Sequence, residues 1–321
     1  MAEPALWQWR YALTPRGRPN ARVTGAGARS GALIRDAGGG VGCVHPWPEL
    51  GDPPLEVHLE SLRTGLPTNL AEQALLCAEI DGLARREGRS LFGRLQIPRS
   101  HWTVLGTEPG EPARVAAEGF RSAKLKCGPD QSDALSRLDF WRVEAPELRF
   151  RLDFNETSTV SRILGFWRTL DEESRRMIDF LEDPVPWKAD DWEALRKAGI
   201  PLAADRDAGV RSRAADWVIL KPAVTRLTEP LERAVREGKR VAITTSMDHA
   251  IGQAYAAYRA AEWGSLFPER IEDCGLLTHE CYENDDFFSL LERDGPILRT
   301  PVGTGLGFDH LIESLPWKPL I

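Results

Sequence analysis

The amino-acid sequence predicts an α/β fold, with a (β/α)8 barrel of the TIM type following an α+β N-terminal domain. Several short apolar stretches, far apart in the sequence, each end at a charged residue. These residues are Lys126, Asp153, Glu182, Asp205 and Lys221. Most intervals between them are about 20 to 30 residues, the length of one strand with its return helix. Polar and apolar side chains also alternate within these stretches, as expected for strands.

The alternation identifies which side chains share a strand face. Lys124 and Lys126 are two residues apart, so they point the same way. In residues 148–155 the charged and amide side chains take the odd positions and the apolar ones take the even positions. Charges on an inward face are costly unless they are paired or bind metal. Because polar groups at the carboxyl ends of barrel strands converge on one site, we expect these side chains to meet at the barrel mouth.

Three segments follow one another along the chain. Residues 1–96 combine strand-like runs such as GALIRD, glycine and proline turns, and one helix near 70–87, which predicts an α+β domain. We expect Asn69 to cap that helix, Glu72 to complete a capping box and Gly88 to end the helix. The barrel is expected over residues 97–284, and residues 285–321 are expected to complete both the barrel and the N-terminal domain.

Composition argues against several classes of protein. The chain has 321 residues and a formal net charge of −7, which argues against a nucleic-acid binder. It contains no signal peptide and no apolar run of about 18 residues, so we expect a cytoplasmic protein that binds no membrane. Five cysteines without metal-ligand spacing are expected to be reduced thiols: Cys43, Cys77, Cys127, Cys274 and Cys281. The sequence leaves a monomer and a homo-oligomer equally open.

The three acids and the lysines together indicate a type of chemistry. Mg²⁺ prefers oxygen ligands in an octahedron, and Asp153, Glu182 and Asp205 would supply three of them. A divalent ion beside lysines suits removal of a proton next to a carboxylate, because the ion stabilises the charge that develops on the oxygens. The sequence therefore predicts an enzyme with a small-molecule carboxylate substrate and Mg²⁺ as cofactor, with Mn²⁺ as the alternative metal.

Each pattern also has a simpler interpretation. A single acid at a strand end is usually a helix cap or a surface charge, and a Lys-x-Lys pair is usually an exposed strand face. A barrel that only binds a sugar or an acid gives no reason for lysines on both sides of three acids. The glycine-rich runs at 38–42 and 303–307 lack the Gly-Lys-[Ser/Thr] ending of a phosphate loop, so we interpret them as turns.

Five motifs in order resemble the enolase superfamily and, within it, the o-succinylbenzoate synthase family of the muconate-lactonizing-enzyme-like subgroup. AKLKCG is similar to the second-strand Lys-x-Lys, LRFRLDFN to the third-strand Asp-x-Asn, and FLEDP to the Glu-[Glu/Asp/Gln]-Pro motif. VILKPA resembles the sixth-strand Lys-Pro, and ITTSMDHAIG the seventh-strand turn rich in Ser and Thr. GGGVGCVHPWPELGD resembles a segment of the superfamily's capping domain. The resemblance implies a modified (β/α)8 TIM-type barrel with an α+β N-terminal capping domain.

The resemblance also implies residue roles. Lys126 would be the general base and Lys221 a cation across the substrate from it, with Mg²⁺ on the three acids. Substrate contacts are implied for Lys124, Asn155, Thr245, Ser246 and Trp47. The implied reaction is the dehydration of SHCHC, a cyclohexadiene carboxylate, to o-succinylbenzoate in menaquinone synthesis, which would make the protein a carbon–oxygen hydro-lyase.

Alternatives remain within the same superfamily. An N-acylamino acid racemase or a dipeptide epimerase would begin with the same proton abstraction. Dipeptide epimerases typically carry Asp-x-Asp on the eighth strand, where this chain has Thr278-His279-Glu280. A non-enzymatic descendant of the fold is disfavoured by the five intact polar positions. Two departures from the family pattern stand out, since Arg206 and Cys43 each replace a usual Glu.

Overall fold

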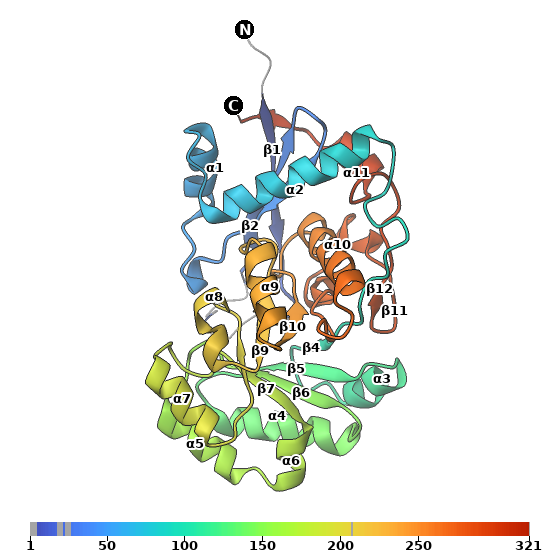
Figure 1. Ribbon diagram of the computed structural model, residues 1–321. Coiled ribbons are helices and arrows are strands. Elements are labelled where there is room, and N and C mark those ends of the chain that lie inside the picture. The colour runs from blue at the N-terminus through green and yellow to red at the C-terminus, as the bar shows by residue number, and fades with distance from the viewer. Residues whose placement is uncertain (1–4, 18–21, 23–26, 207, 321) are drawn as a thin grey trace.

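The computed structural model describes residues 5–17, 22, 27–206 and 208–320. Figure 1 shows an N-terminal layer of strands and helices above a larger α/β body. The N-terminal sheet is antiparallel, in the order β13-β1-β2-β3. Its strands are Leu6–Leu13 (β1), Arg29–Asp36 (β2), Val41–Val44 (β3) and Lys318–Pro319 (β13). Because β13 pairs with β1, the last described strand of the chain joins the N-terminal sheet.

Two helices, Leu55–Arg63 (α1) and Asn69–Arg86 (α2), and the 3-10 turn Pro48–Leu50 (η1) complete this layer. Helix α2 approaches β3 closely, since a Cβ on Gly42 would lie 1.9 Å from the carbonyl oxygen of Ala74. The predicted cap and capping box at Asn69 are wrong. Thr68 caps the helix by accepting from the backbone N–H of Ala71, whereas Asn69 Nδ2 donates to the carbonyl of Val224 at 2.5 Å. The Asn69 side chain contacts the barrel instead of capping the helix, and the preceding residue, Thr68, provides the cap.

The larger body contains seven parallel strands that follow one another in sequence order across the sheet. They are Trp102–Val104 (β4), Ser122–Lys126 (β5), Arg149–Asp153 (β6), Ile178–Glu182 (β7), Leu202–Ala204 (β8), Trp217–Leu220 (β9) and Arg240–Ile243 (β10). The helices are Glu111–Ala117 (α3), Gln131–Glu144 (α4), Val160–Thr169 (α5), Glu172–Met177 (α6), Ala189–Lys197 (α7), Ala208–Arg211 (α8), Thr228–Arg236 (α9) and Ala250–Leu266 (α10), with the 3-10 turn Ser212–Ala214 (η2) after α8.

An irregular segment takes the place of an eighth strand and closes the barrel. Thr244, directly after β10, forms a bridge with Gly275, and Cys274 forms one with Ser100, before β4. The backbone N–H of His101 donates to the carbonyl of Cys274 at 2.8 Å. Together with the seven parallel strands, these bridges complete the modified (β/α)8 barrel with a capping domain, so the predicted fold class is confirmed.

The remaining elements continue from the barrel back to the N-terminal layer. They are the 3-10 turns Thr278–Cys281 (η3) and Phe288–Leu290 (η4), the short strands Arg293–Asp294 (β11) and Ile297–Leu298 (β12), and Asp309–Ser314 (α11). The predicted domain boundaries at 96/97 and 284/285 stay predictions. All five cysteines are free and buried. None of the helices within the described ranges is long and apolar enough to cross a membrane.

Strand alternation accounts for the barrel core. The even-numbered residues Phe150, Leu152 and Phe154 are completely buried. Phe154 makes an edge contact with Phe166 of α5, so this face packs under the helices. The odd-numbered residues Arg151 and Asp153 are 1% and 3% exposed although both are charged. Their burial therefore depends on charged partners inside the barrel.

Candidate active site

A row of charged side chains lies along the carboxyl ends of five neighbouring strands. Lys126, Asp153 and Glu182 are the last residues of β5, β6 and β7, and they are paired in register across the sheet. Asp205 and Lys221 directly follow β8 and β9. Because the sheet order is β5-β6-β7-β8-β9, the acids of the three central strands lie between lysines on both sides.

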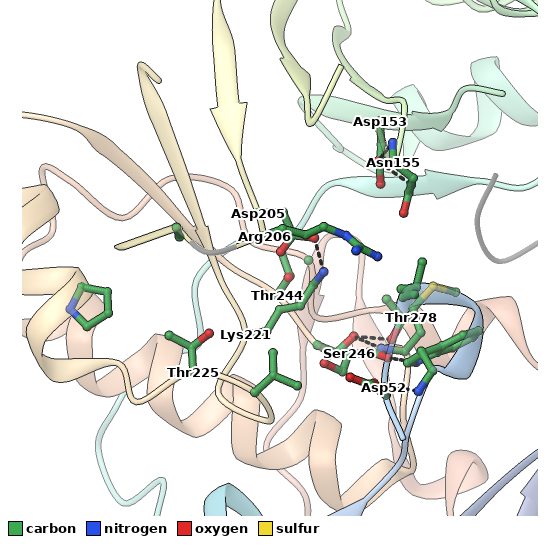
Figure 2. A pocket seen from close by; sticks show the side chains of 18 of the residues that line it. Asp52, Asp153, Asn155, Asp205, Arg206, Lys221, Thr225, Thr244, Ser246 and Thr278 are labelled. Atoms are coloured by element: carbon green, nitrogen blue, oxygen red, sulfur yellow. Dashed lines mark hydrogen bonds and ion pairs between the residues drawn. The ribbon is translucent and has the colours of Figure 1, made fainter. Parts of the chain in front are cut away.

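The lysines contact the acids directly. Lys124 Nζ lies 2.7 Å from both carboxylate oxygens of Glu182 and 3.0 Å from Asp153 Oδ2. Lys126 Nζ donates to the same Asp153 oxygen at 2.8 Å. Lys221 forms an ion pair with Asp205, which Figure 2 shows at the cavity wall. Each of the three predicted ligand acids is therefore held by at least one lysine.

The closeness of these charges shifts their pKa values. Burial alone would favour the neutral amine of Lys124, but the carboxylates of Asp153 and Glu182 hold its pKa above the usual range. Burial opposes ionisation of Asp153, yet Lys124 and Lys126 keep the pKa of that carboxyl well below its ordinary value. Burial and the neighbouring Asp153 carboxylate raise the pKa of Glu182 to about 7. The middle acid of the row is thus the one that most needs another cation.

Residues beside the row hold it in position. Asp183 has a φ of 40°, and its carboxylate accepts from the backbone N–H groups of Asp205 at 3.3 Å and Arg206 at 3.1 Å. Asn155, with a φ of 48°, donates from Nδ2 to Asp153 Oδ1 at 2.6 Å. Positive φ is uncommon for residues other than glycine and persists where surrounding contacts impose it. The strand ends are therefore braced by side chains outside the row.

A cavity of about 910 Å³ opens above the row. The N-terminal layer contributes to its wall, and Trp47 Nε1 donates to the carbonyl of Ser246 at 2.7 Å. Thr245 donates its backbone N–H to Gly275, and its hydroxyl pairs with that of Thr278 at 2.6 Å. Nine predicted site residues line the cavity: Trp47, Lys124, Lys126, Asp153, Asn155, Asp205, Lys221, Thr245 and Ser246. Glu182 does not line the cavity and is 1% exposed.

Several residues near the row were not identified from the sequence. Asp183 was present in the FLEDP motif, so its adjacency to Glu182 was a usable signal. His101 also lines the cavity, and its Nδ1 lies 3.0 Å from Arg151 Nη1. Since a guanidinium only donates, His101 Nδ1 accepts. No local pattern marks His101, because the strand that follows it is only three residues long.

The acids fit a divalent ion in their chemistry. Three carboxylates on adjacent strands supply the hard oxygen ligands that Mg²⁺ prefers, and Lys124 Nζ already lies against two of them as a cation. No group of three His, Cys, Asp or Glu side chains in the described parts of the chain is arranged to enclose a metal ion. The lysines contact the acid oxygens instead, so binding a metal requires these ion pairs to rearrange.

Comparisons with known proteins place the chain in a family. Residues 6–84 match the model of the O-succinylbenzoate synthase N-terminal domain, and residues 111–310 match that of the enolase C-terminal domain-like family. An o-succinylbenzoate synthase from Bdellovibrio bacteriovorus is 34% identical over 324 residues, which covers 97% of each chain. The chain belongs to the enolase superfamily, and its N-terminal domain is that of the o-succinylbenzoate synthases.

Solved structures agree with this family at the level of the fold. An N-succinyl Arg/Lys racemase from Bacillus cereus has a TM-score of 0.78 at 16% identity, with 98% of both chains covered. A dipeptide epimerase from Enterococcus faecalis, complexed with Mg and a dipeptide, has a TM-score of 0.75 at 18% identity, with 96% of this chain and 99% of that one covered. At these identities the likeness shows the shared fold alone.

Proposed function

We propose that the protein is an o-succinylbenzoate synthase that removes water from SHCHC with Mg²⁺ as cofactor, as a step in menaquinone synthesis. One observation carries the proposal: Lys126 and Lys221 lie at opposite ends of a row formed by Asp153, Glu182 and Asp205. The 34% identity to an o-succinylbenzoate synthase over the whole chain supports this choice of substrate.

The arrangement gives Lys126 and Lys221 different roles in the reaction. Asp153, Glu182 and Asp205 would hold the Mg²⁺, which supplies positive charge where negative charge develops on the substrate carboxylate. Lys126 Nζ takes the proton from the carbon next to that carboxylate and returns it to the departing hydroxyl, so that one C–H bond and one C–O bond break and water leaves. Lys221 remains an ammonium on the other side and stabilises the transient anion.

The ion pair of Lys221 bears on the role of that lysine. Asp205 holds Lys221 in its charged form, because it raises the pKa of that amine against the opposing effect of burial. A lysine that stays charged suits a stabilising role better than that of a second base. A racemase needs the second lysine to exchange protons on the opposite face of the substrate. Lys126 is paired with Asp153 as Lys221 is with Asp205, and both pairs open when the acids bind a metal, so kinetics decide between dehydration and racemisation.

The eighth position of the barrel bears on the dipeptide epimerase alternative. From this segment, Gly275 and Thr278 line the cavity, and neither is an acid. An Asp-x-Asp pair, the motif that the family resemblance associates with dipeptide binding, is therefore missing from this described part of the wall. This observation does not bear on the racemase alternative. Kinetic measurements must distinguish racemisation from dehydration.

The test measures SHCHC turnover by the wild type and by single-lysine variants. Lys126→Ala should lower kcat by about 10²- to 10⁴-fold, the usual effect of removing a general acid or base. Lys221→Ala should lower it by about 10²- to 10³-fold, the usual effect of removing a group that stabilises developing charge. Lys197→Ala, whose side chain is 73% exposed on α7, serves as the matched control and should behave as wild type. Exchange of the α-proton of both enantiomers of an N-acylamino acid in D₂O, without turnover of SHCHC, would show a racemase instead.

A further inference from the structure

Arg206 introduces a positive charge where the family pattern usually has a glutamate. It directly follows Asp205, and its backbone N–H is held by Asp183 Oδ2 at 3.1 Å, which fixes the starting point of its side chain. Figure 2 shows the guanidinium extending from the end of β8 into the cavity, in the direction of Asn155. The side chain lines the cavity and is 25% exposed, so a ligand can reach it.

Among the described residues, Arg206 forms a long ion pair with Glu156 but no hydrogen bond to it. Glu156 Oε2 accepts from Arg22 Nη2 at 2.9 Å, and Glu156 Oε1 accepts from Arg211 Nη1 at 2.7 Å. Arg206 Nη1 is 3.7 Å from Glu156 Oε2, too far for a hydrogen bond. Since both oxygens of Glu156 have closer partners among the described residues, the donors of Arg206 are available to a bound anion.

The adjoining wall leaves space for such an anion. Ala208 and Gly209 line the cavity beyond Arg206 with small side chains or none. Lys221, on the neighbouring strand, is engaged by Asp205. Arg206 therefore lies beside this space as a cation. Among the described residues, no acid is in hydrogen-bonding contact with its guanidinium.

Thr245 and Ser246, for which substrate contacts are implied, each have a backbone group that is already engaged. The N–H of Thr245 donates to Gly275 at 3.0 Å, and the carbonyl of Ser246 accepts from Trp47 Nε1 at 2.7 Å. The Thr245 N–H cannot bind a carboxylate without losing its present partner, and the Ser246 carbonyl, which only accepts hydrogen bonds, cannot bind one at all. Arg206 offers a second carboxylate on the substrate the charged donors that these two groups lack.

We propose that Arg206 binds the distal carboxylate of a dicarboxylate substrate, while the first carboxylate lies at the row of acids with its metal. A guanidinium matches a carboxylate with two parallel hydrogen bonds, which gives both affinity and direction. The identity of the substrate rests on the proposed function, in which the distal carboxylate is that of the succinyl side chain. Arg206 thus makes the site selective for a substrate with two carboxylates over one with an uncharged tail.

Calorimetric titration in Mg²⁺ buffer compares two probes that differ only at the distal end, o-succinylbenzoate and 2-butyrylbenzoate, in which a methyl group replaces the distal carboxylate. Arg206→Met should raise the Kd of o-succinylbenzoate by about 10- to 100-fold, the usual worth of a charged hydrogen-bonded contact, and leave that of 2-butyrylbenzoate within about twofold. Arg206→Lys, which keeps the charge without the fork, should lie between Arg206→Met and wild type.

Arg226→Met is the matched control, because Arg226 also lines the cavity but pairs with Glu72 at 2.6 Å and its side chain is 71% exposed. It should bind both probes as wild type does. Equal losses for both probes in Arg206→Met, or no loss for o-succinylbenzoate, would overturn the inference. Selective loss in a protein whose wild type does not turn over SHCHC would instead sustain Arg206 as a carboxylate-binding residue and reject the proposed function.

Discussion

Asp81 of α2 connects three parts of the chain, and replacing it should destabilise the whole protein. The side chain is completely buried. Its oxygens accept from the backbone N–H of Val41 at 2.9 Å, the backbone N–H of Leu306 at 2.6 Å and Arg85 Nε at 2.6 Å. Arg85 in turn donates to the carbonyl of Gly307 at 2.8 Å. Asp81 thereby joins α2, β3 and the C-terminal segment.

The loss in free energy of unfolding follows from the groups that Asp81→Ala leaves without partners. In Asp81→Ala two buried N–H groups lose their acceptors, each costing about 1–3 kcal/mol, and Arg85 loses one of its two acidic partners while keeping Asp309. Burial raises the pKa of Asp81 despite Arg85, so part of this cost is offset because an expensive buried charge disappears. We expect a net loss of about 3–5 kcal/mol, the range for breaking a buried ion pair.

Thermal unfolding followed by circular dichroism gives the readout. For a chain of 321 residues, a loss of that size should lower the midpoint by about 4–8 °C. Asp81→Asn keeps one oxygen acceptor and should fall between wild type and Asp81→Ala. Glu60→Ala removes an exposed pair with Arg63, whose side chains are 61% and 37% exposed, and should change stability by less than about 1 kcal/mol. A midpoint for Asp81→Ala as close to wild type as that of Glu60→Ala would refute the reasoning.

Two further predictions concern single acids. Glu182→Gln should weaken Mg²⁺ binding at least about tenfold by calorimetry, because the middle carboxylate of the row is lost. Asp248→Asn should remove a pH dependence of stability. Burial raises the pKa of Asp248 to about 7, and its Oδ1 has no hydrogen-bond partner in the described residues. A carboxyl whose pKa rises on folding stabilises the fold at acidic pH and loses that contribution as the pH rises from about 4 to about 7. The wild-type unfolding midpoint should therefore fall between about pH 4 and pH 7, and that of Asp248→Asn should fall less.

Exposed acids provide the controls for both measurements. Glu172→Gln, with a side chain 76% exposed on α6, should bind Mg²⁺ as wild type does. Asp139→Asn, 61% exposed on α4, should keep the wild-type dependence of stability on pH. Unchanged Mg²⁺ affinity in Glu182→Gln would contradict its role as a ligand, and parallel pH profiles for wild type and Asp248→Asn would contradict the assignment of the buried carboxyl.

The sequence by itself predicted the barrel and the order of its charges, because both depend on short-range rules. Alternation within residues 148–155 separated the inward Asp153 from Phe150 and Leu152, which the structure buries on the other face. The interval between charged strand ends identified the parallel strands, since each strand needs a return helix of similar length. The helix near 70–87 was also predicted, but its cap was not, since Asn69 contacts Val224 far along the chain.

Only the tertiary structure decided which partner each charge takes. Alternation places Lys124 and Lys126 on one face, but it cannot show that Lys124 contacts Glu182 while both contact Asp153. The turn after β7 adopts a positive φ angle at Asp183, whose carboxylate accepts from the backbone N–H groups of Asp205 and Arg206 at the end of the neighbouring strand. Local sequence carries no record of those contacts, because they join residues that become neighbours only when the barrel closes. The backbone of Arg206, whose side chain lines the cavity, is held by a contact of the same kind from Asp183, directly after the adjacent strand.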